Sequence, residues 1–147
     1  LQVEEGPHLL ADVTPGLDGA QPVVADIVVR ADRRQILGLR PLAVLQPDIT
    51  KWGGFSGGLP LARRIVAAGK RYCPHMFTGA PGVLASAHLL AAVDAPGGML
   101  EYGIGPHPAR DVLLDRSVEG GAFALGDAPG LGLDVDARRL KPFLLAL

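Results

Sequence analysis

Short apolar runs alternate with longer stretches of helical periodicity along the 147-residue chain. The apolar runs predict strands at residues 1–3, 22–25, 42–46, 70–73 and 99–101. Between them, apolar positions at helical spacing predict helices at residues 30–39, 58–68 and 83–93. This alternation is typical of βα units, and strands that are apolar throughout indicate a parallel sheet covered on both faces. We therefore expect one domain of the α/β class.

The pattern is weaker near both ends of the chain. Residues 6–20 contain repeated prolines and glycines and predict no clear helix. After Pro106 we expect a short helix at residues 109–114, turns at 120–121 and 128–132, and a closing helix at 136–147 that Pro142 interrupts. Because Leu1 lies inside a predicted strand, we expect the chain to be part of a longer protein.

Composition excludes several classes of function. The formal net charge of −1 argues against a nucleic-acid-binding protein, which needs a basic surface. Cys73 is the single cysteine, which excludes an intrachain disulfide and a cysteine metal cluster and fits a reducing cytoplasm. The longest apolar runs fall short of the roughly 20 residues of a membrane-spanning helix, so we expect no membrane partner.

Ionisable residues stand at the carboxyl end of each predicted strand. These residues are Glu4, Asp26, Asp48, His75 and Glu101, and the intervals between their positions are 22, 22, 27 and 26 residues. Each interval is the length of one βα unit, so the five side chains are expected at the same edge of a barrel or of an open sheet. Strands also end in charged residues simply because they end at water, but the regular spacing favours a functional site.

Four segments together resemble the C-terminal barrel half of the mandelate racemase and muconate lactonizing enzyme family, in the enolase superfamily. They are "LQPDITKWGG", "YCPHMFTGAPGVLASAHLLAA", "MLEYG" and "PGLGLDVD", and the resemblance extends over residues 30–142, with "VEE" at 3–5 before it. It implies a partial (β/α)8 TIM barrel of parallel strands, holding about strands 4 or 5 to 8, without the capping domain and first strands. It also implies a Mg²⁺-dependent enzyme that abstracts the proton alpha to a carboxylate.

The resemblance assigns roles to the five residues at the strand ends. His75 is similar to the general base or acid, Asp48 to its hydrogen-bonded partner, and Glu101 to the electrophile that supports the substrate carboxylate. Glu4 and Asp26 are similar to the metal ligands. These residue types suit the chemistry, because imidazole both takes and gives a proton near neutral pH and Mg²⁺ prefers oxygen ligands.

The chain also departs from the family pattern. Asp26 follows Ala25, where the family has a Gly-Glu pair, and Gly6 interrupts the family's Glu-Glu-Pro motif. The third metal carboxylate and a lysine motif belong to the absent strands. Because two carboxylates alone would hold Mg²⁺ weakly, we expect the chain to be incomplete as an enzyme.

Several further residues allow two interpretations. Lys51 contacts either a substrate carboxylate or Asp48, and Phe77, like Trp52, either lines a substrate pocket or covers the rim. We expect Cys73 to pack as a small core residue. We expect His88 to serve in helix packing or at the surface and His107 to lie in a solvated loop. The glycines at 53, 54, 57 and 58 are expected to form the turn into the next helix.

These expectations lead to two functional hypotheses. The first is an enolate-forming enzyme, or its C-terminal part, that acts as a sugar-acid dehydratase or a 2-hydroxy-acid racemase or epimerase. The His75–Asp48 pair favours these reactions over cycloisomerisation, for which the family tends to use lysines. Its partners would be a small carboxylate substrate and either a second copy of the chain or the missing N-terminal part. The alternative is a non-catalytic remnant or an oligomerising α/β scaffold.

Overall fold

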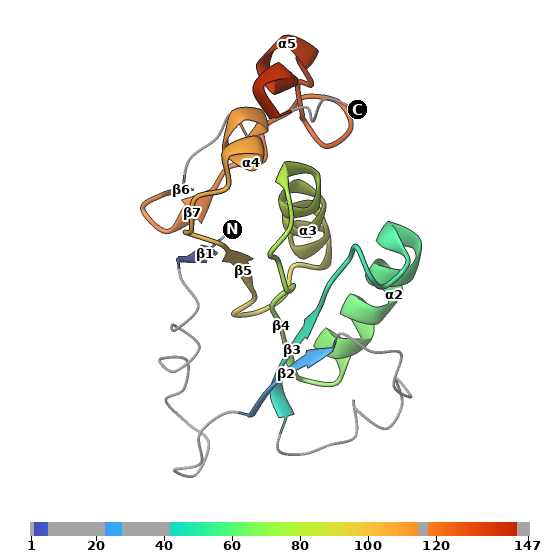
Figure 1. Cartoon of the computed structure of the whole chain (residues 1–147). Helices are drawn as coiled ribbons and strands as arrows, with labels where there is room; N and C mark the ends of the chain where they lie inside the picture. Colours follow the sequence, from blue (N-terminus) through green and yellow to red (C-terminus); the bar gives the residue numbers. More distant parts are fainter. Residues whose placement is uncertain (1, 6–22, 28–41, 115–117, 144–147) are drawn as a thin grey trace.

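The computed structural model describes residues 2–5, 23–27, 42–114 and 118–143, with the backbone alone described in the first two ranges (Figure 1). The predicted strands are confirmed as β1 (Gln2–Glu5), β2 (Val23–Ile27), β3 (Leu42–Pro47), β4 (Arg71–Tyr72) and β5 (Met99–Tyr102). Helices follow three of them, namely α2 (Gly54–Ala67), α3 (Ala80–Val93) and α4 (Pro108–Leu113). The α/β class is therefore confirmed. The predicted helix at 30–39 and the segment 6–20 lie outside the described residues.

The C-terminal part differs from the expectation in two respects. The Gly120-Gly121 turn is confirmed, but it joins a small hairpin of β6 (Val118–Glu119) and β7 (Ala122–Phe123) that the sequence pattern does not predict. Both turn glycines adopt positive φ angles, 57° and 74°, which glycine tolerates without strain. Within the described part of the predicted closing helix, the chain forms α5 (Ala137–Leu140) and then the 3-10 helix η2 (Lys141–Phe143), because Pro142 cannot donate the hydrogen bond that would continue the α-helix. Residues 144–147 lie outside the described residues.

The described strands form two sheets. One sheet has the order β2-β3-β4 and is parallel throughout, as predicted. The other has the order β5-β1-β7-β6, in which β1 pairs parallel with β5 and antiparallel with β7. Within these two sheets β1 therefore pairs with β5 and not with β2. The parallel strands do not form one continuous barrel wall over the described residues, and the barrel stays a prediction.

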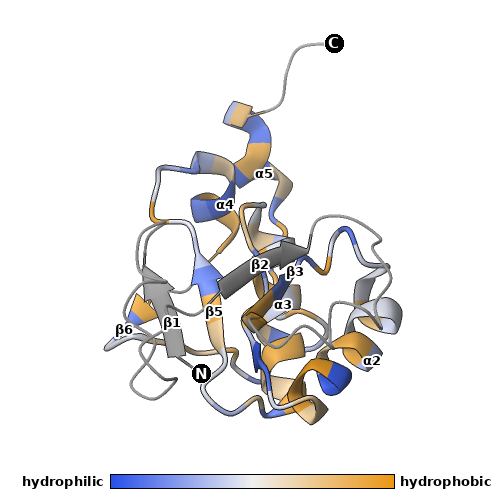
Figure 2. Cartoon of the chain, turned by 90° about the horizontal axis from the view of Figure 1, so that it is seen from below, coloured by the Kyte–Doolittle hydropathy of each residue, from blue (hydrophilic) through white to orange (hydrophobic). Residues whose placement is uncertain are grey.

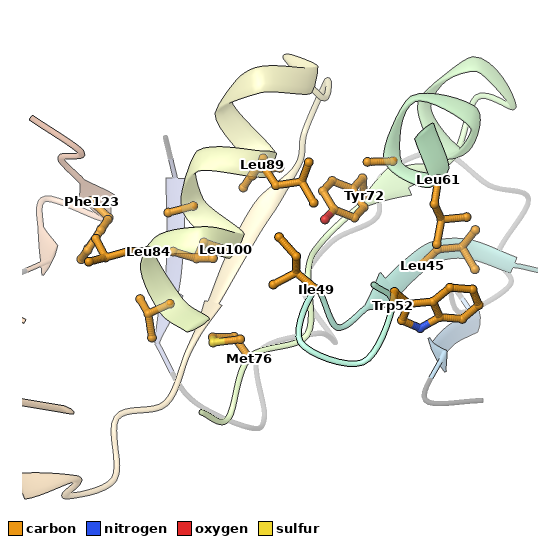
Figure 3. Packing of buried hydrophobic residues seen from close by; sticks show 14 of the residues in the cluster. Leu45, Ile49, Trp52, Leu61, Tyr72, Met76, Leu84, Leu89, Leu100 and Phe123 are labelled. Atoms are coloured by element: carbon orange, nitrogen blue, oxygen red, sulfur yellow. The ribbon is translucent and has the colours of Figure 1, made fainter. Parts of the chain in front are cut away.

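Residues alternate between the two faces of β3 and β4. Leu45 and Tyr72 are register partners, and both pack into the hydrophobic core with Leu61 of α2 (Figure 3). Val44 pairs with Arg71 and therefore belongs to the opposite face. The core thus covers the face of β3 and β4 that carries Leu45 and Tyr72, and the opposite face carries the buried Val44 beside Arg71.

The helices α2 and α3 pack closely against each other. A Cβ added to Gly58 of α2 would lie 2.8 Å from the side chain of Leu89 in α3, so glycine permits this approach. Gly53 lies in the predicted turn and Gly54 is the first residue of α2, with φ angles of 82° and 62°, whereas Gly57 and Gly58 lie inside α2. Figure 2 shows both hydrophobic and hydrophilic residues on α2, as expected for a helix with one face on the core.

Figures 1 and 2 both place α4 and α5 together at one end of the molecule. In the part of the chain that the structure describes, no helix combines the length and the apolar character needed to cross a bilayer.

Candidate active site

Asp48 follows directly after β3, and its carboxylate is almost completely buried, with 1% of the residue exposed. Its Oδ1 accepts hydrogen bonds from the backbone N–H of Thr50 at 2.8 Å and from the Thr50 hydroxyl at 2.6 Å. Its Oδ2 forms an ion pair with Lys51 Nζ at 2.9 Å. Local contacts over three residues therefore fix the orientation of this carboxylate at the strand end.

These contacts also keep Asp48 ionised. Burial by itself raises the pKa of a carboxyl group, because it disfavours the charged form. Hydrogen bonds from Lys51 and Thr50, together with the Lys51 charge, outweigh this effect and lower the pKa of Asp48 below its usual value of 3.8. Asp48 is thus a buried negative charge that faces the neighbouring strand end.

His75 lies beyond the end of β4, next to Asp48. Its Nδ1 is 3.5 Å from Asp48 Oδ2, and 12% of its side chain is exposed. The two residues meet because β3 and β4 are neighbouring parallel strands, with Leu45 opposite Tyr72. A separation of 3.5 Å is longer than a strong hydrogen bond, so the structure shows the two groups as close neighbours. The predicted His75–Asp48 proximity is present in the fold.

Glu101 lies on β5 and is tied to the same region. Its Oε2 accepts a hydrogen bond from the backbone N–H of Met76 at 2.8 Å. Because Met76 follows His75 in the chain, this bond anchors the carboxylate beside the His75 backbone. The end of β5 is thereby joined to the end of β4, although these strands belong to different sheets.

Lys51 and Phe77 also lie beside the Asp48–His75 pair. Of the two interpretations of Lys51, the structure places its ammonium on Asp48, with 42% of the side chain exposed. The ring of Phe77 meets the His75 ring edge to face, with centroids 4.9 Å apart and an interplanar angle of 73°. Phe77 itself is 60% exposed. Trp52, by contrast, is buried in the hydrophobic core.

The backbone places the two predicted metal ligands, but their side chains lie outside what the structure describes. Glu4 is the register partner of Glu101, whereas Asp26 is the partner of Gln46 in the other sheet. Strand pairing therefore does not set Glu4 and Asp26 side by side. Among the described side chains, no three His, Cys, Asp or Glu residues form a group that could hold a metal ion. The described side chains alone therefore do not fit a Mg²⁺ site.

The remaining candidates have structural roles. Cys73 is buried, as predicted. His88 packs on the C-terminal segment, with Nε2 3.4 Å from the Leu131 carbonyl oxygen. His107 is not simply a solvated loop residue, because its Nδ1 accepts a hydrogen bond from the Arg110 N–H and caps α4.

Sequence reasoning missed two residues near the site. The Asp-x-Thr spacing of Asp48 and Thr50 is a turn signal that could have identified the Thr50 hydroxyl as a donor to the carboxylate. Arg110 had no such signal, because most of its partners are backbone carbonyl oxygens.

Comparison with known proteins shows the family of the chain. The enolase C-terminal domain-like family matches residues 10–139. D-galactarolactone cycloisomerase of Agrobacterium fabrum is 27% identical over 118 residues, which are 74% of this chain and 31% of that protein. Arabinonate dehydratase of Saccharolobus solfataricus is 25% identical over 103 residues, which are 69% of this chain and 27% of that protein.

A solved structure gives the same result. The mandelate racemase/muconate lactonizing enzyme from Bordetella bronchiseptica RB50 has 42% sequence identity and a TM-score of 0.76, over 83% of this chain and 35% of that one. The chain thus spans about a third of the length of the proteins it matches. As the resemblance predicted, the chain belongs to the enolase C-terminal domain-like family, in the C-terminal region of mandelate racemase and muconate lactonizing enzymes.

Proposed function

We propose that this chain carries the proton-transfer part of a site that forms an enolate from a small carboxylic acid. The observation that carries the proposal is the position of His75 Nδ1 at 3.5 Å from the buried carboxylate of Asp48. A carboxylate beside one ring nitrogen sets the tautomer and stabilises the imidazolium that forms when the ring accepts a proton. His75 then takes the proton alpha to the substrate carboxylate through its other ring nitrogen and returns it in the reverse step.

Glu101 supports the substrate in this proposal. Its Oε2 is held by the Met76 N–H, which leaves the carboxyl group oriented at the end of β5. A hydrogen bond between this carboxyl group and a substrate carboxylate requires one proton shared between the two groups. Such a bond would stabilise the charge that develops on the substrate as the alpha proton leaves. Phe77 would exclude water from the exposed side of the imidazole.

Removal of the alpha proton is the step that the candidate reactions share, whatever their product. The relatives include a cycloisomerase as well as a dehydratase, so similarity does not favour one reaction. Sugar acids are the substrate class that we propose first, because arabinonate is a sugar acid and the dehydratase is named for it. Dehydration and epimerisation of a 2-hydroxy acid both begin with the removal of the alpha proton, which His75 would carry out.

We further propose that the parallel strands belong to a (β/α)8 barrel completed by the part of the relatives that this chain does not span. Mg²⁺ would then need ligands from that part in addition to Glu4 and Asp26, because two carboxylates hold this ion weakly. His75, Asp48 and Glu101 lie within this chain, so substitutions that test their roles can be made in it.

The test is exchange of the alpha proton in D2O, followed by proton NMR with a panel of sugar acids and 2-hydroxy acids. We expect His75→Asn to lower the exchange rate by at least about a hundredfold, as is usual for loss of a general base. His88→Asn is the matched control, because the contact of His88 Nε2 is with the Leu131 carbonyl oxygen, at 3.4 Å. An equal rate in wild type and His75→Asn would refute the assignment. No exchange in wild type, with or without Mg²⁺, would show that this chain has no proton-transfer activity by itself.

A further inference from the structure

Arg110 is a buried charged residue that contacts the segment directly after Glu101. It lies in the first turn of α4, and only 7% of it is exposed. Its guanidinium turns toward the loop between β5 and α4, where Nη1 donates to the Gly103 carbonyl oxygen and Nη2 donates to that of Gly105 at 3.2 Å. Its Nε donates to Asp111 Oδ1 at 2.8 Å. The side chain thus clamps two carbonyl groups of one loop.

The same guanidinium packs on the end of β5. Its Cζ lies 4.9 Å from the centroid of the Tyr102 ring, within the range of a cation–π interaction. Tyr102 and Gly103 are the two residues that follow Glu101. A buried cation is costly unless it is paired and hydrogen-bonded, so the loop conformation and the buried arginine depend on each other.

Because Tyr102 and Gly103 follow Glu101 in the chain, the contacts of Arg110 with them restrict the backbone position of Glu101. Glu101 accepts the Met76 N–H at 2.8 Å, and this bond requires the end of β5 to stay in register with the segment after β4. We propose that Arg110 is a positioning residue for Glu101: it fixes Tyr102 and Gly103 so that the Glu101 carboxylate stays beside the His75 segment. The catalytic consequence of this role rests on the proposed function.

A lysine should not replace Arg110 in this role. The clamp needs a planar group with several donors at fixed angles, whereas a lysine ammonium is a compact point charge on a flexible stem. Arg110→Lys therefore keeps the charge but loses the geometry. Arg138→Met is a matched control, because the Arg138 side chain is 92% exposed and pairs locally with Asp136 at 3.0 Å.

The Met76 amide reports the position of Glu101 without any need for activity. We would measure its hydrogen exchange by NMR in the 147-residue chain and divide it by the exchange rate of Cys73. The Cys73 N–H donates to the Leu45 carbonyl oxygen at 3.1 Å, so it monitors the opening of the same segment independently of Glu101. We expect the Met76 to Cys73 ratio to rise about tenfold in Arg110→Met and at least about threefold in Arg110→Lys. Arg138→Met should leave the ratio unchanged.

An unchanged ratio in both Arg110 variants would overturn the proposal, even if their melting temperatures fall, because the role would then be structural only. If Arg110→Met does not fold, the Arg110→Lys result decides. On a substrate that wild type accepts, both variants should lower kcat more than they raise KM, and the reverse would contradict a positioning role. If wild type exchanges no alpha proton, the proposed function fails, while the Met76 ratio still decides whether Arg110 positions Glu101.

Discussion

His75 Nδ1 lies 3.5 Å from Asp48 Oδ2, and the same oxygen forms an ion pair with Lys51 Nζ at 2.9 Å. One buried carboxylate is therefore shared between an imidazole and an ammonium group. Asp48 and His75 are separated by 27 positions in the sequence, and the parallel pairing of β3 with β4 brings them together. The effects of substitutions at Asp48, Thr50 and Lys51 on stability and activity are predicted from these contacts.

The first prediction concerns the pH dependence of stability. Because the pKa of Asp48 is lower in the folded protein than its ordinary value of 3.8, its ionised form contributes stability above that value. Protons then bind preferentially to the unfolded chain, and this contribution is lost as the pH falls through the folded pKa. The difference in unfolding free energy between wild type and Asp48→Asn should be largest near pH 7 and shrink below pH 3.8.

Urea denaturation at a series of pH values measures this difference. Asp127→Asn serves as the control, because Asp127 is exposed. A difference between wild type and Asp48→Asn that is constant with pH, or that grows on acidification, would show that Asp48 is not held in its charged form.

The second prediction concerns the Thr50 hydroxyl, which donates to Asp48 Oδ1 at 2.6 Å. Thr50→Val removes this donor while the backbone N–H of residue 50 remains. Since hydrogen bonds to charged groups contribute more than neutral ones, we expect a loss of about 1–2 kcal/mol in unfolding free energy. Thr50→Ser keeps the hydroxyl and should lose less than about 0.5 kcal/mol. Equal stability of the Val and Ser variants would argue against the hydrogen bond.

The third prediction separates the two interpretations of Lys51. Because 42% of the Lys51 side chain is exposed, solvent screens its ion pair, and Lys51→Met should change the unfolding free energy by less than about 1 kcal/mol. If Lys51 acts on Asp48, kcat should change while KM stays within about twofold. Steady-state kinetics on an accepted substrate measures both. A large rise in KM at constant kcat would instead place Lys51 on the substrate carboxylate.

Much of this arrangement was predictable from the pattern of residues. The apolar run at 42–46 predicted β3, and the regular interval to His75 placed that residue at the same edge as Asp48, because consecutive parallel strands end on one side. The contact between the two also requires β3 and β4 to be paired neighbours, as the structure shows. The run of small and apolar residues at 83–93 likewise predicted most of α3.

Other features carried no sequence signal. The pairing of β1 with β5 was not predicted, because the spacing of strands along the chain does not specify which edges meet. The strands β6 and β7 have two residues each, too few for a period of alternation. The bond from Met76 to Glu101 and the clamp by Arg110 use backbone groups that every residue possesses. Such contacts become visible only when the fold sets the partners beside each other.

The central claim is that Asp48 and His75 act together in proton transfer, and a double-mutant cycle on alpha-proton exchange tests it most directly. The variants are Asp48→Asn, His75→Asn and the double variant, measured with one accepted substrate in D2O. If the two residues act as a unit, the double variant should exchange no more slowly than His75→Asn, to within about threefold. Losses that simply multiply, so that the double variant is slower by the full product of the single effects, would contradict the claim.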